Sequence, residues 1–133
     1  MAVTVQWDDD AEKKAIIWTL VGRWTWDEFY RVTYDQTRHL MFSAPHTVHV
    51  IADIEHSSYT TSMSGALTQV RNVALAYPDN WGALVLVNSH PFLTILMGVF
   101  KRTYPDLADR IFVAASRAEA YAIIEQFQRE WVV

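Results

Sequence analysis

A short run of apolar residues in the second half of the chain places the strongest limit on the fold. Residues 82–87 are Gly-Ala-Leu-Val-Leu-Val, without a polar side chain at any position. A strand with this pattern is covered on both faces, which is typical of the centre of a parallel sheet between helices. The run is too short for a bilayer, which takes about 20 apolar residues. It therefore predicts a central strand of an α/β domain.

The other segments alternate between strand and helix patterns. Residues 3–7 and 15–21 are two short strand-like segments around a polar turn, which predicts an antiparallel hairpin. Besides residues 82–87, later strands are predicted at residues 47–54 and 110–114. The spacing of apolar residues predicts four helices, over about residues 25–43, 64–76, 91–103 and 116–131.

Each strand after the hairpin is followed by a helix. The order β-β-α-β-α-β-α-β-α predicts a single α/β domain over residues 1–133. We expect a mixed, mostly parallel five-stranded sheet, four helices and one antiparallel edge formed by the N-terminal hairpin. In the third strand, alternation places His49, Ile51 and Asp53 on one face of the sheet.

Composition removes several classes of function. The 133 residues carry a formal net charge of −4, which argues against sequence-independent nucleic-acid binding, because such binding needs a basic face. The absence of cysteine excludes disulfides, thiol catalysis and cysteine-ligated metals. The first residues show neither a basic n-region nor a long apolar run, so we expect no signal peptide, no transmembrane segment and a cytoplasmic location.

The sequence contains no familiar catalytic or cofactor motif. None of the five histidines forms a His-x-x-x-His or His-Glu-x-x-His pair, so we expect no metal site. Neither a Gly-x-Ser-x-Gly elbow nor a glycine-rich nucleotide loop occurs. We therefore predict a non-enzymatic protein without catalytic residues or cofactors.

Hydroxyl side chains are concentrated directly after the third predicted strand. A strand end, a hydroxyl-rich loop and the start of a helix meet there, and ligand sites of open α/β sheets lie at such places. The residues that we assign to a candidate switch loop are Asp53, Ser57, Ser58, Thr61, Ser62 and Gly65.

Ser64, at the predicted start of the second helix, is the candidate phosphorylation site. A phosphate there would add nearly two negative charges beside free N–H groups and the positive end of the helix. The fold would tolerate this charge, whereas a partner docked on the same surface would be repelled. The alternative is that one hydroxyl caps the helix and the others are solvated.

Two short segments and the order of the elements carry a family resemblance. Residues 51–53 (Ile-Ala-Asp) and 62–67 (Ser-Met-Ser-Gly-Ala-Leu) resemble the STAS fold of the anti-sigma-factor antagonists. In that family a strand ends in an Asp- or Asn-bearing segment, and an Asp-Ser-Ser-Gly-Leu-like turn opens the next helix. The second Ser of the turn is the regulatory phosphosite of the family.

This resemblance aligns Ser64 with the phosphosite and Gly65 with the glycine of the turn. Ser62 replaces the acidic residue of the family's turn, and Met63 replaces its first Ser. Residues 22–29 are also similar to a group of uncharacterised bacterial proteins that resemble both STAS and CRAL-TRIO domains.

The resemblance implies a regulatory or protein-interaction module that is switched by phosphorylation at Ser64. The implied partner is an anti-sigma-factor or a kinase-like protein, and a homodimer is a further possibility.

The CRAL-TRIO relatives imply an alternative, which is a module that binds a lipid or another small apolar ligand in a cleft beside the sheet. The simpler interpretation of the aromatic residues that could line this cleft is that they belong to the hydrophobic core and its rim. The residues that would line such a cleft are Trp24, Trp26, Tyr59, Trp81, Phe92 and Met97.

Overall fold

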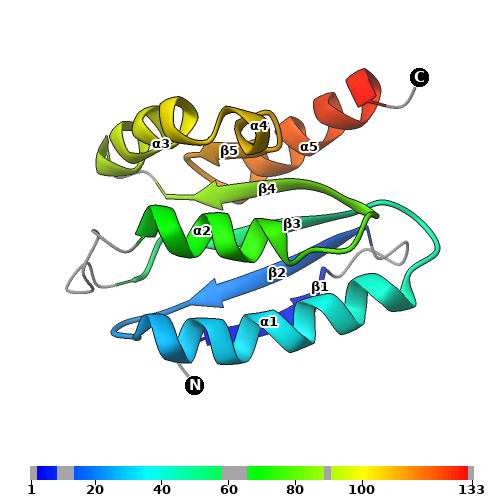
Figure 1. Ribbon diagram of the computed structural model, residues 1–133, viewed down its shortest axis with the longest axis horizontal. Coiled ribbons are helices and arrows are strands. Elements are labelled where there is room, and N and C mark those ends of the chain that lie inside the picture. Colours follow the sequence, from blue (N-terminus) through cyan, green and yellow to red (C-terminus); the bar gives the residue numbers. More distant parts are fainter. Residues whose placement is uncertain (1–2, 9–13, 58–65, 89–90, 132–133) are drawn as a thin grey trace.

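The computed structural model describes residues 3–8, 14–57, 66–88 and 91–131 (Figure 1). Its strands are β1 (Val3–Trp7), β2 (Ala15–Leu20), β3 (Val48–Asp53), β4 (Trp81–Val87) and β5 (Ile111–Ala114). Its helices are α1 (Trp26–Ser43), α2 (Ala66–Leu75), α3 (Pro91–Thr103), α4 (Pro105–Ala108) and α5 (Arg117–Trp131). The predicted site residues that lie outside the described part are Ser58, Tyr59, Thr61, Ser62, Ser64 and Gly65.

The five strands form one sheet in the order β1-β2-β3-β4-β5. β1 pairs with β2 in antiparallel orientation, and β2, β3, β4 and β5 are parallel to their neighbours. The predicted mixed, mostly parallel sheet with an N-terminal hairpin is therefore confirmed. Because the strands follow chain order, β1 and β5 form the two edges (Figure 1).

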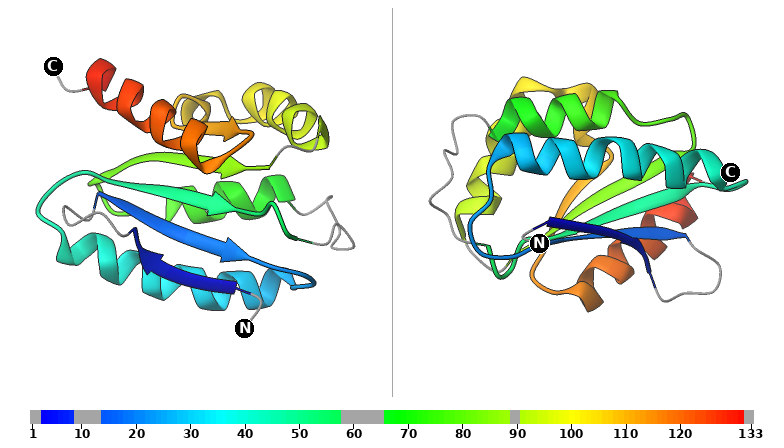
Figure 2. Two further views of the ribbon diagram at one scale, coloured as in Figure 1. Left: turned by 180° about the vertical axis from the view of Figure 1, so that it is seen from behind. Right: turned by 90° about the horizontal axis from the view of Figure 1, so that it is seen from below.

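The helices cover the two faces of the sheet unequally. A large core lies between the sheet and α1, α2 and α3, and includes Trp18, Phe29 and Phe100. A smaller core, which includes Ile51 and Ile124, lies between the sheet and α5. Figures 1 and 2 show α1 and α2 on one face and α5 on the other. The sheet is thus the middle of three layers.

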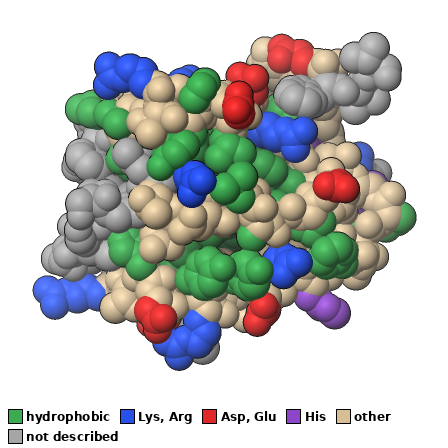
Figure 3. Space-filling view, in the orientation of Figure 1, with side chains coloured by type: hydrophobic (Ala, Val, Ile, Leu, Met, Phe, Trp, Pro, Cys, Tyr) green, Lys and Arg blue, Asp and Glu red, His purple; other side chains and the backbone are tan. Residues whose placement is uncertain are grey.

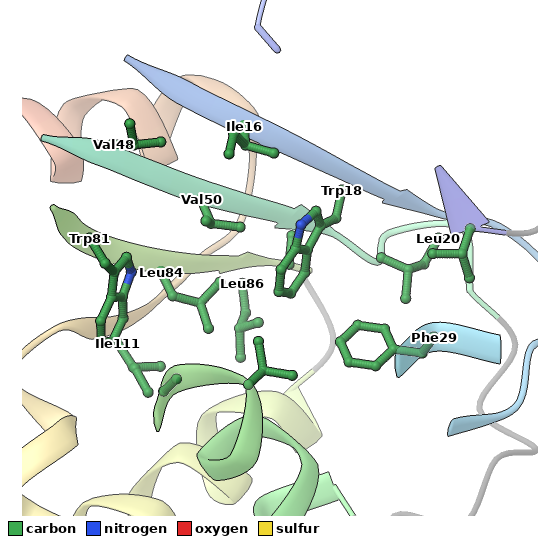
Figure 4. Packing of buried hydrophobic residues seen from close by; sticks show 14 of the residues in the cluster. Ile16, Trp18, Leu20, Phe29, Val48, Val50, Trp81, Leu84, Leu86 and Ile111 are labelled. Carbon is green, nitrogen blue, oxygen red and sulfur yellow. The ribbon is translucent and has the colours of Figure 1, made fainter. Parts of the chain in front are cut away.

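Trp18 lies in the middle of the larger core (Figure 4). Its ring meets that of Phe29 edge-on, with the centroids 5.4 Å apart. Its Nε1 donates a hydrogen bond of 2.9 Å to Oγ1 of Thr37. Both side chains are buried, so the bond satisfies a donor that water does not reach and fixes α1 against β2.

The spacings of Thr25 with Glu28 and of Ser116 with Glu119 are those of capping boxes, and both pairs lie at the starts of helices. The N–H of Glu28 donates to Oγ1 of Thr25 at 3.1 Å, at the start of α1. Before α5, the N–H of Glu119 donates to Oγ of Ser116, and Oε2 of Glu119 accepts from the N–H of Ala115. The side chains therefore pair with backbone donors that the first helical turn leaves free.

The helix count differs from the prediction. Sequence analysis predicted that the third helix ends at about residue 103, and α3 does end at Thr103. Pro105 then occupies the first position of α4, a further helix of a single turn. Proline has no N–H to lose at that position, so it both ends one helix and starts the next. None of the described helices is long and apolar enough to cross a membrane.

Candidate functional site

The carboxyl ends of β2, β3 and β4 bring several predicted site residues to one end of the sheet. We call this end, where the parallel strands finish, the carboxyl edge. It differs from the side edges that β1 and β5 form. Asp53 is the last residue of β3, and Ser57 follows it by four positions. Ser57 forms a bridge with Gly22, which follows β2. The described part of the candidate switch loop, residues 53–57, is therefore attached to this edge.

The hydroxyl of Ser57 holds two segments together. Its Oγ donates to the carbonyl of Leu20 at 2.9 Å and accepts from Nε1 of Trp24 at 3.0 Å. The N–H of Gly22, whose φ is +67°, donates to the carbonyl of His56. That left-handed backbone conformation favours glycine. Ser57 is thus a structural anchor, with its proton already donated to protein.

Asp53 attaches β3 to the first residue of α5. Its Oδ2 accepts a hydrogen bond of 2.8 Å from Nε of Arg117, and its Oδ1 accepts from the N–H of Glu55 at 3.1 Å. The Asp53 side chain is only 13% exposed, so the ion pair is partly shielded from water. This carboxylate stabilises the edge where α5 begins.

Asn88, directly after β4, is a polar residue of this edge to which sequence analysis gave no role. It is buried, its Nδ2 donates to the carbonyl of Ile54, and its own N–H donates to the carbonyl of Ala114. Its position after an apolar strand was the signal that could have identified it. Asn88 connects the ends of three strand segments.

Of the described residues proposed for the ligand cleft, Trp24 and Trp26 lie apart from Trp81. Trp24 and Trp26 pack on each other and on Phe29, with centroids 4.9 to 5.7 Å apart, near the carboxyl edge. Trp81 is the first residue of β4, at the opposite end of the strands, and its ring meets that of Tyr77 edge-on, with the centroids 4.9 Å apart. The Phe92 side chain, like Tyr59, lies outside what the structure describes.

His49 lies at the amino edge, which is the end of the sheet where the parallel strands begin. The sequence did not reveal which groups surround it there. Val48 pairs with Trp81 and Val50 pairs with Leu84, so β4 contains one more residue than β3 between these pairs. This is the geometry of a β-bulge, which takes a backbone group out of the ladder. The freed N–H of Ala83 donates to Nδ1 of His49 at 3.0 Å.

The surroundings of His49 keep its ring neutral. Burial is the main cause that lowers its pKa from 6.5 to about 4, and the charges of Lys14 and His46 act in the same direction. Because Nδ1 accepts, the neutral ring carries its proton on Nε2, which lies 3.1 Å from the side-chain amide of Gln128. The amide atom at this distance is Nε2 of Gln128, so a hydrogen bond from the ring requires the amide to turn its oxygen to that position. His49 therefore serves as a structural bridge between β3, β4 and α5.

The outward side of α1 carries an aromatic row, which we define as Tyr30, Tyr34, Arg38 and Phe42. The rings of Tyr30 and Tyr34 are stacked, with centroids 4.8 Å apart. Arg38 lies over the rings of Tyr34 and Phe42, at 5.1 and 5.6 Å from their centroids. Spacing by four residues places all four side chains along one line of the helix.

This aromatic row is open to solvent. Phe42 is 67% exposed and Tyr30 is 38% exposed. Figure 3 shows hydrophobic side chains gathered over α1 and α2, with basic side chains among them. Tyr30 and Phe42 are outside the buried set of α1, which is Phe29, Val32, Thr33, Thr37 and Met41. The signal for the row was the spacing of residues 30, 34, 38 and 42.

Within the described part of the chain, no group of three or more His, Asp and Glu residues is placed to hold a metal ion. The described side chains that could most readily take part in chemistry are those of His49, Asp53 and Ser57. Each of them is bonded to another residue of the protein. Comparisons with protein-family models, with curated proteins and with solved structures find no match to this chain. Function therefore has to be argued from the geometry.

Proposed function

We propose that this chain is a non-enzymatic, regulatory protein-interaction module that uses the aromatic row of α1 to bind another protein. The observation that carries the proposal is the exposure of Tyr30 and Phe42 on a single helix face. Contiguous exposed apolar side chains mark interaction sites on soluble domains. Tyrosine and arginine are also enriched among the residues that dominate binding energy at protein interfaces.

Arg38 indicates the chemistry of the partner. Its Nη1 donates to Oη of Tyr34, and its guanidinium stacks on two aromatic rings. None of the described acidic residues forms an ion pair with it. A partner surface that is apolar and bears a carboxylate would therefore complete the aromatic row. The family resemblance suggests an anti-sigma-factor or a kinase-like protein, and the cysteine-free sequence suggests a cytoplasmic location.

We retain Ser64 as the proposed point of regulation. In the sequence it stands two residues before Ala66, where α2 begins, and the first turn of α2 contains no acidic residue. A phosphate would therefore meet no carboxylate in that turn. Ser57, the nearest described hydroxyl before it, is committed to Leu20 and Trp24 and is the weaker candidate.

The binding proposal is tested by crosslinking in the native host with Phe42→Ala and a matched control, Ile95→Ala. Ile95 is equally exposed, at 66%, but lies on α3. We expect Phe42→Ala to reduce the yield of a crosslinked partner about tenfold, whereas Ile95→Ala leaves it unchanged. Equal yields from the two variants would overturn the assignment of the surface. If crosslinks form only between two copies of this chain, the aromatic row would be the interface of a homodimer and not the binding site of another protein.

The regulatory proposal has a separate test. Intact-mass analysis of the protein from its host should show a phosphorylated fraction that disappears in Ser64→Ala. Ser64→Asp should weaken partner capture, and Ser64→Ala should preserve it. Unmodified protein in every growth condition, together with full capture by Ser64→Asp, would overturn regulation at Ser64 and leave the binding surface standing.

The alternative, an apolar ligand in an aromatic cleft, has less support. Trp24 donates to Ser57 and packs on Trp26, whereas Trp81 lies at the opposite end of the strands. These separate positions favour the simpler interpretation, in which the aromatic rings stabilise the core and its rim.

A further inference from the structure

A hollow lies at the amino edge of the sheet, at the opposite end of the strands from Asp53 and Ser57. Its volume is about 200 Å³, and it is lined by residues around the starts of β3 and β4, by Arg110 just before β5 and by the second half of α5. Figure 1 shows that α5 runs toward the end of the sheet where β4 begins. We call this hollow the amino-edge pocket. It shares no residue with the aromatic row of α1.

Buried rings close the base of the amino-edge pocket. The imidazole of His49 occupies the place that a side chain at Gly82 would take. The ring of Phe127 meets that of His49 edge-on, with the centroids 5.8 Å apart. Both side chains line the pocket and are buried, so they form its base and not its rim. Polar contacts made above such a base are strengthened by the low local dielectric constant.

His49 determines which end of the Gln128 amide the pocket presents. Nδ1 of His49 accepts from the N–H of Ala83, so the ring proton is on Nε2, which lies 3.1 Å from the side-chain amide of Gln128. The amide pairs with this proton by turning its oxygen to the ring, and its NH₂ group is then directed away from the ring. Gln128 is half-buried and lines the pocket, so this NH₂ group is a donor for a ligand.

Arg110 brings further donors to the pocket at a fixed place. Its Nη1 donates to the carbonyl of Trp81 at 3.1 Å, and its guanidinium carbon lies 5.4 Å from the centroid of the Trp81 ring. A guanidinium carries five N–H donors and binds a carboxylate through two of them. Together with the NH₂ group of Gln128, Arg110 makes the pocket complementary to a carboxylate.

The pocket also contains a carboxylate of its own. Asp79, in the turn before β4, lines the pocket, is exposed and forms no ion pair with the residues that the structure describes. Thr47, just before β3, is also exposed and adds a hydroxyl group. An ammonium group would be complementary to these two acceptors, whereas a ligand with negative charge alone would be repelled by Asp79.

The volume of the pocket limits the size of its ligand. One molecule of liquid water takes up about 30 Å³, so the pocket has room for about seven non-hydrogen atoms. Sites for drug-sized ligands are larger, at about 300–1,000 Å³. A free amino acid with a small side chain has the required size and carries a carboxylate and an ammonium group together.

We propose that the amino-edge pocket binds a free amino acid or another small amino-carboxylate. The carboxylate of the ligand accepts from the NH₂ group of Gln128 and from Arg110, and its ammonium group donates to Asp79 and Thr47. The remaining carbon atoms lie against Phe127. Because the ligand contacts α5 and the sheet together, binding stabilises the folded chain.

The test is a titration of the full chain with the standard L-amino acids and with γ-aminobutyrate, each alone, by calorimetry. At least one should bind saturably and raise the melting temperature. Its deaminated and decarboxylated analogues (propionate and ethylamine in the case of L-alanine) should bind about tenfold more weakly or less, because each leaves one charged side of the pocket unpaired. Preference for γ-aminobutyrate over the α-amino acids would identify a longer spacing between the two charges. In NMR spectra the side-chain NH₂ resonances of Gln128 should shift on binding.

Two pairs of variants locate the binding site. Gln128→Glu keeps an acceptor for His49 but replaces the NH₂ donor by an oxygen, so it should weaken binding about tenfold or more, whereas Gln126→Glu, on the exposed side of α5, should change it little. Asp79→Asn should likewise weaken binding, whereas Asp109→Asn, which is exposed and outside this pocket, should preserve it. Asp79 lies in an exposed turn, so its variant decides the matter even if Gln128→Glu does not fold.

Each outcome supports or overturns the assignment. Saturable binding that both pocket variants weaken and both controls preserve supports an amino-carboxylate site. Absence of binding by every compound at millimolar concentration overturns it, as does binding that Asp79→Asn and Gln128→Glu both retain. If propionate binds as tightly as L-alanine and Asp79→Asn strengthens its binding, the pocket is an anion site and the role of Asp79 is refuted.

Discussion

Of the described glycines, Gly82 has the least space for an added side chain. A Cβ atom at this position would overlap the imidazole of His49 and lie 2.8 Å from Cγ2 of Thr47. Since His49 is held by Ala83 and Gln128, it has little freedom to move away. We expect Gly82→Ala to lower the free energy of unfolding by about 1–3 kcal/mol, measured by urea denaturation.

Gly98→Ala is the matched control for this prediction. The same atom is added in open space on the exposed side of a helix, so it should raise the free energy of unfolding by about 0.5–1 kcal/mol. Equal effects of the two substitutions would contradict the close contact between Gly82 and His49.

His49 gives the protein a defined dependence of stability on pH. Its folded pKa is lowered to about 4 from the ordinary 6.5, so between these values the unfolded chain binds a proton that the folded chain excludes. The free energy of unfolding should therefore fall as the pH drops from 6.5 toward 4, by on the order of 3 kcal/mol from this group.

Denaturant titrations at several pH values check the His49 prediction. His49→Asn should lower stability at pH 7 and remove much of the slope below pH 6.5, whereas His39→Asn, at an exposed position on α1, should preserve the slope. An unchanged slope in His49→Asn would show that other groups cause the dependence.

At the scale of elements, the attachment of α1 to β2 depends on one buried hydrogen bond. Thr37→Val keeps the shape of the side chain but leaves Nε1 of Trp18 without its acceptor. We expect a loss of about 1–3 kcal/mol in the free energy of unfolding, measured by thermal or urea denaturation.

Thr33→Val is the control for this loss. Thr33 is equally buried, but its hydroxyl donates to the carbonyl of Phe29, which also serves the helix ladder. It should therefore cost less than Thr37→Val. A larger loss in Thr33→Val would contradict the importance of the Trp18 bond.

Local sequence patterns predicted most elements because their determinants are local. The apolar run at residues 82–87 became β4, and the capping boxes at Thr25 and Ser116 stand at the starts of α1 and α5. Period alone does not decide which flank of an amphipathic helix faces the sheet, and Tyr30 lies on the exposed flank of α1. Packing against β1 and β2 made that choice.

At the scale of the whole molecule, the candidate sites were harder to predict than the fold. Ser57 bonds to Leu20, which is 37 positions away in the sequence. Asp53 bonds to Arg117, 64 positions away, and His49 contacts Gln128, 79 positions away. Such contacts arise only from the assembled sheet, so no local spacing in the sequence encodes them.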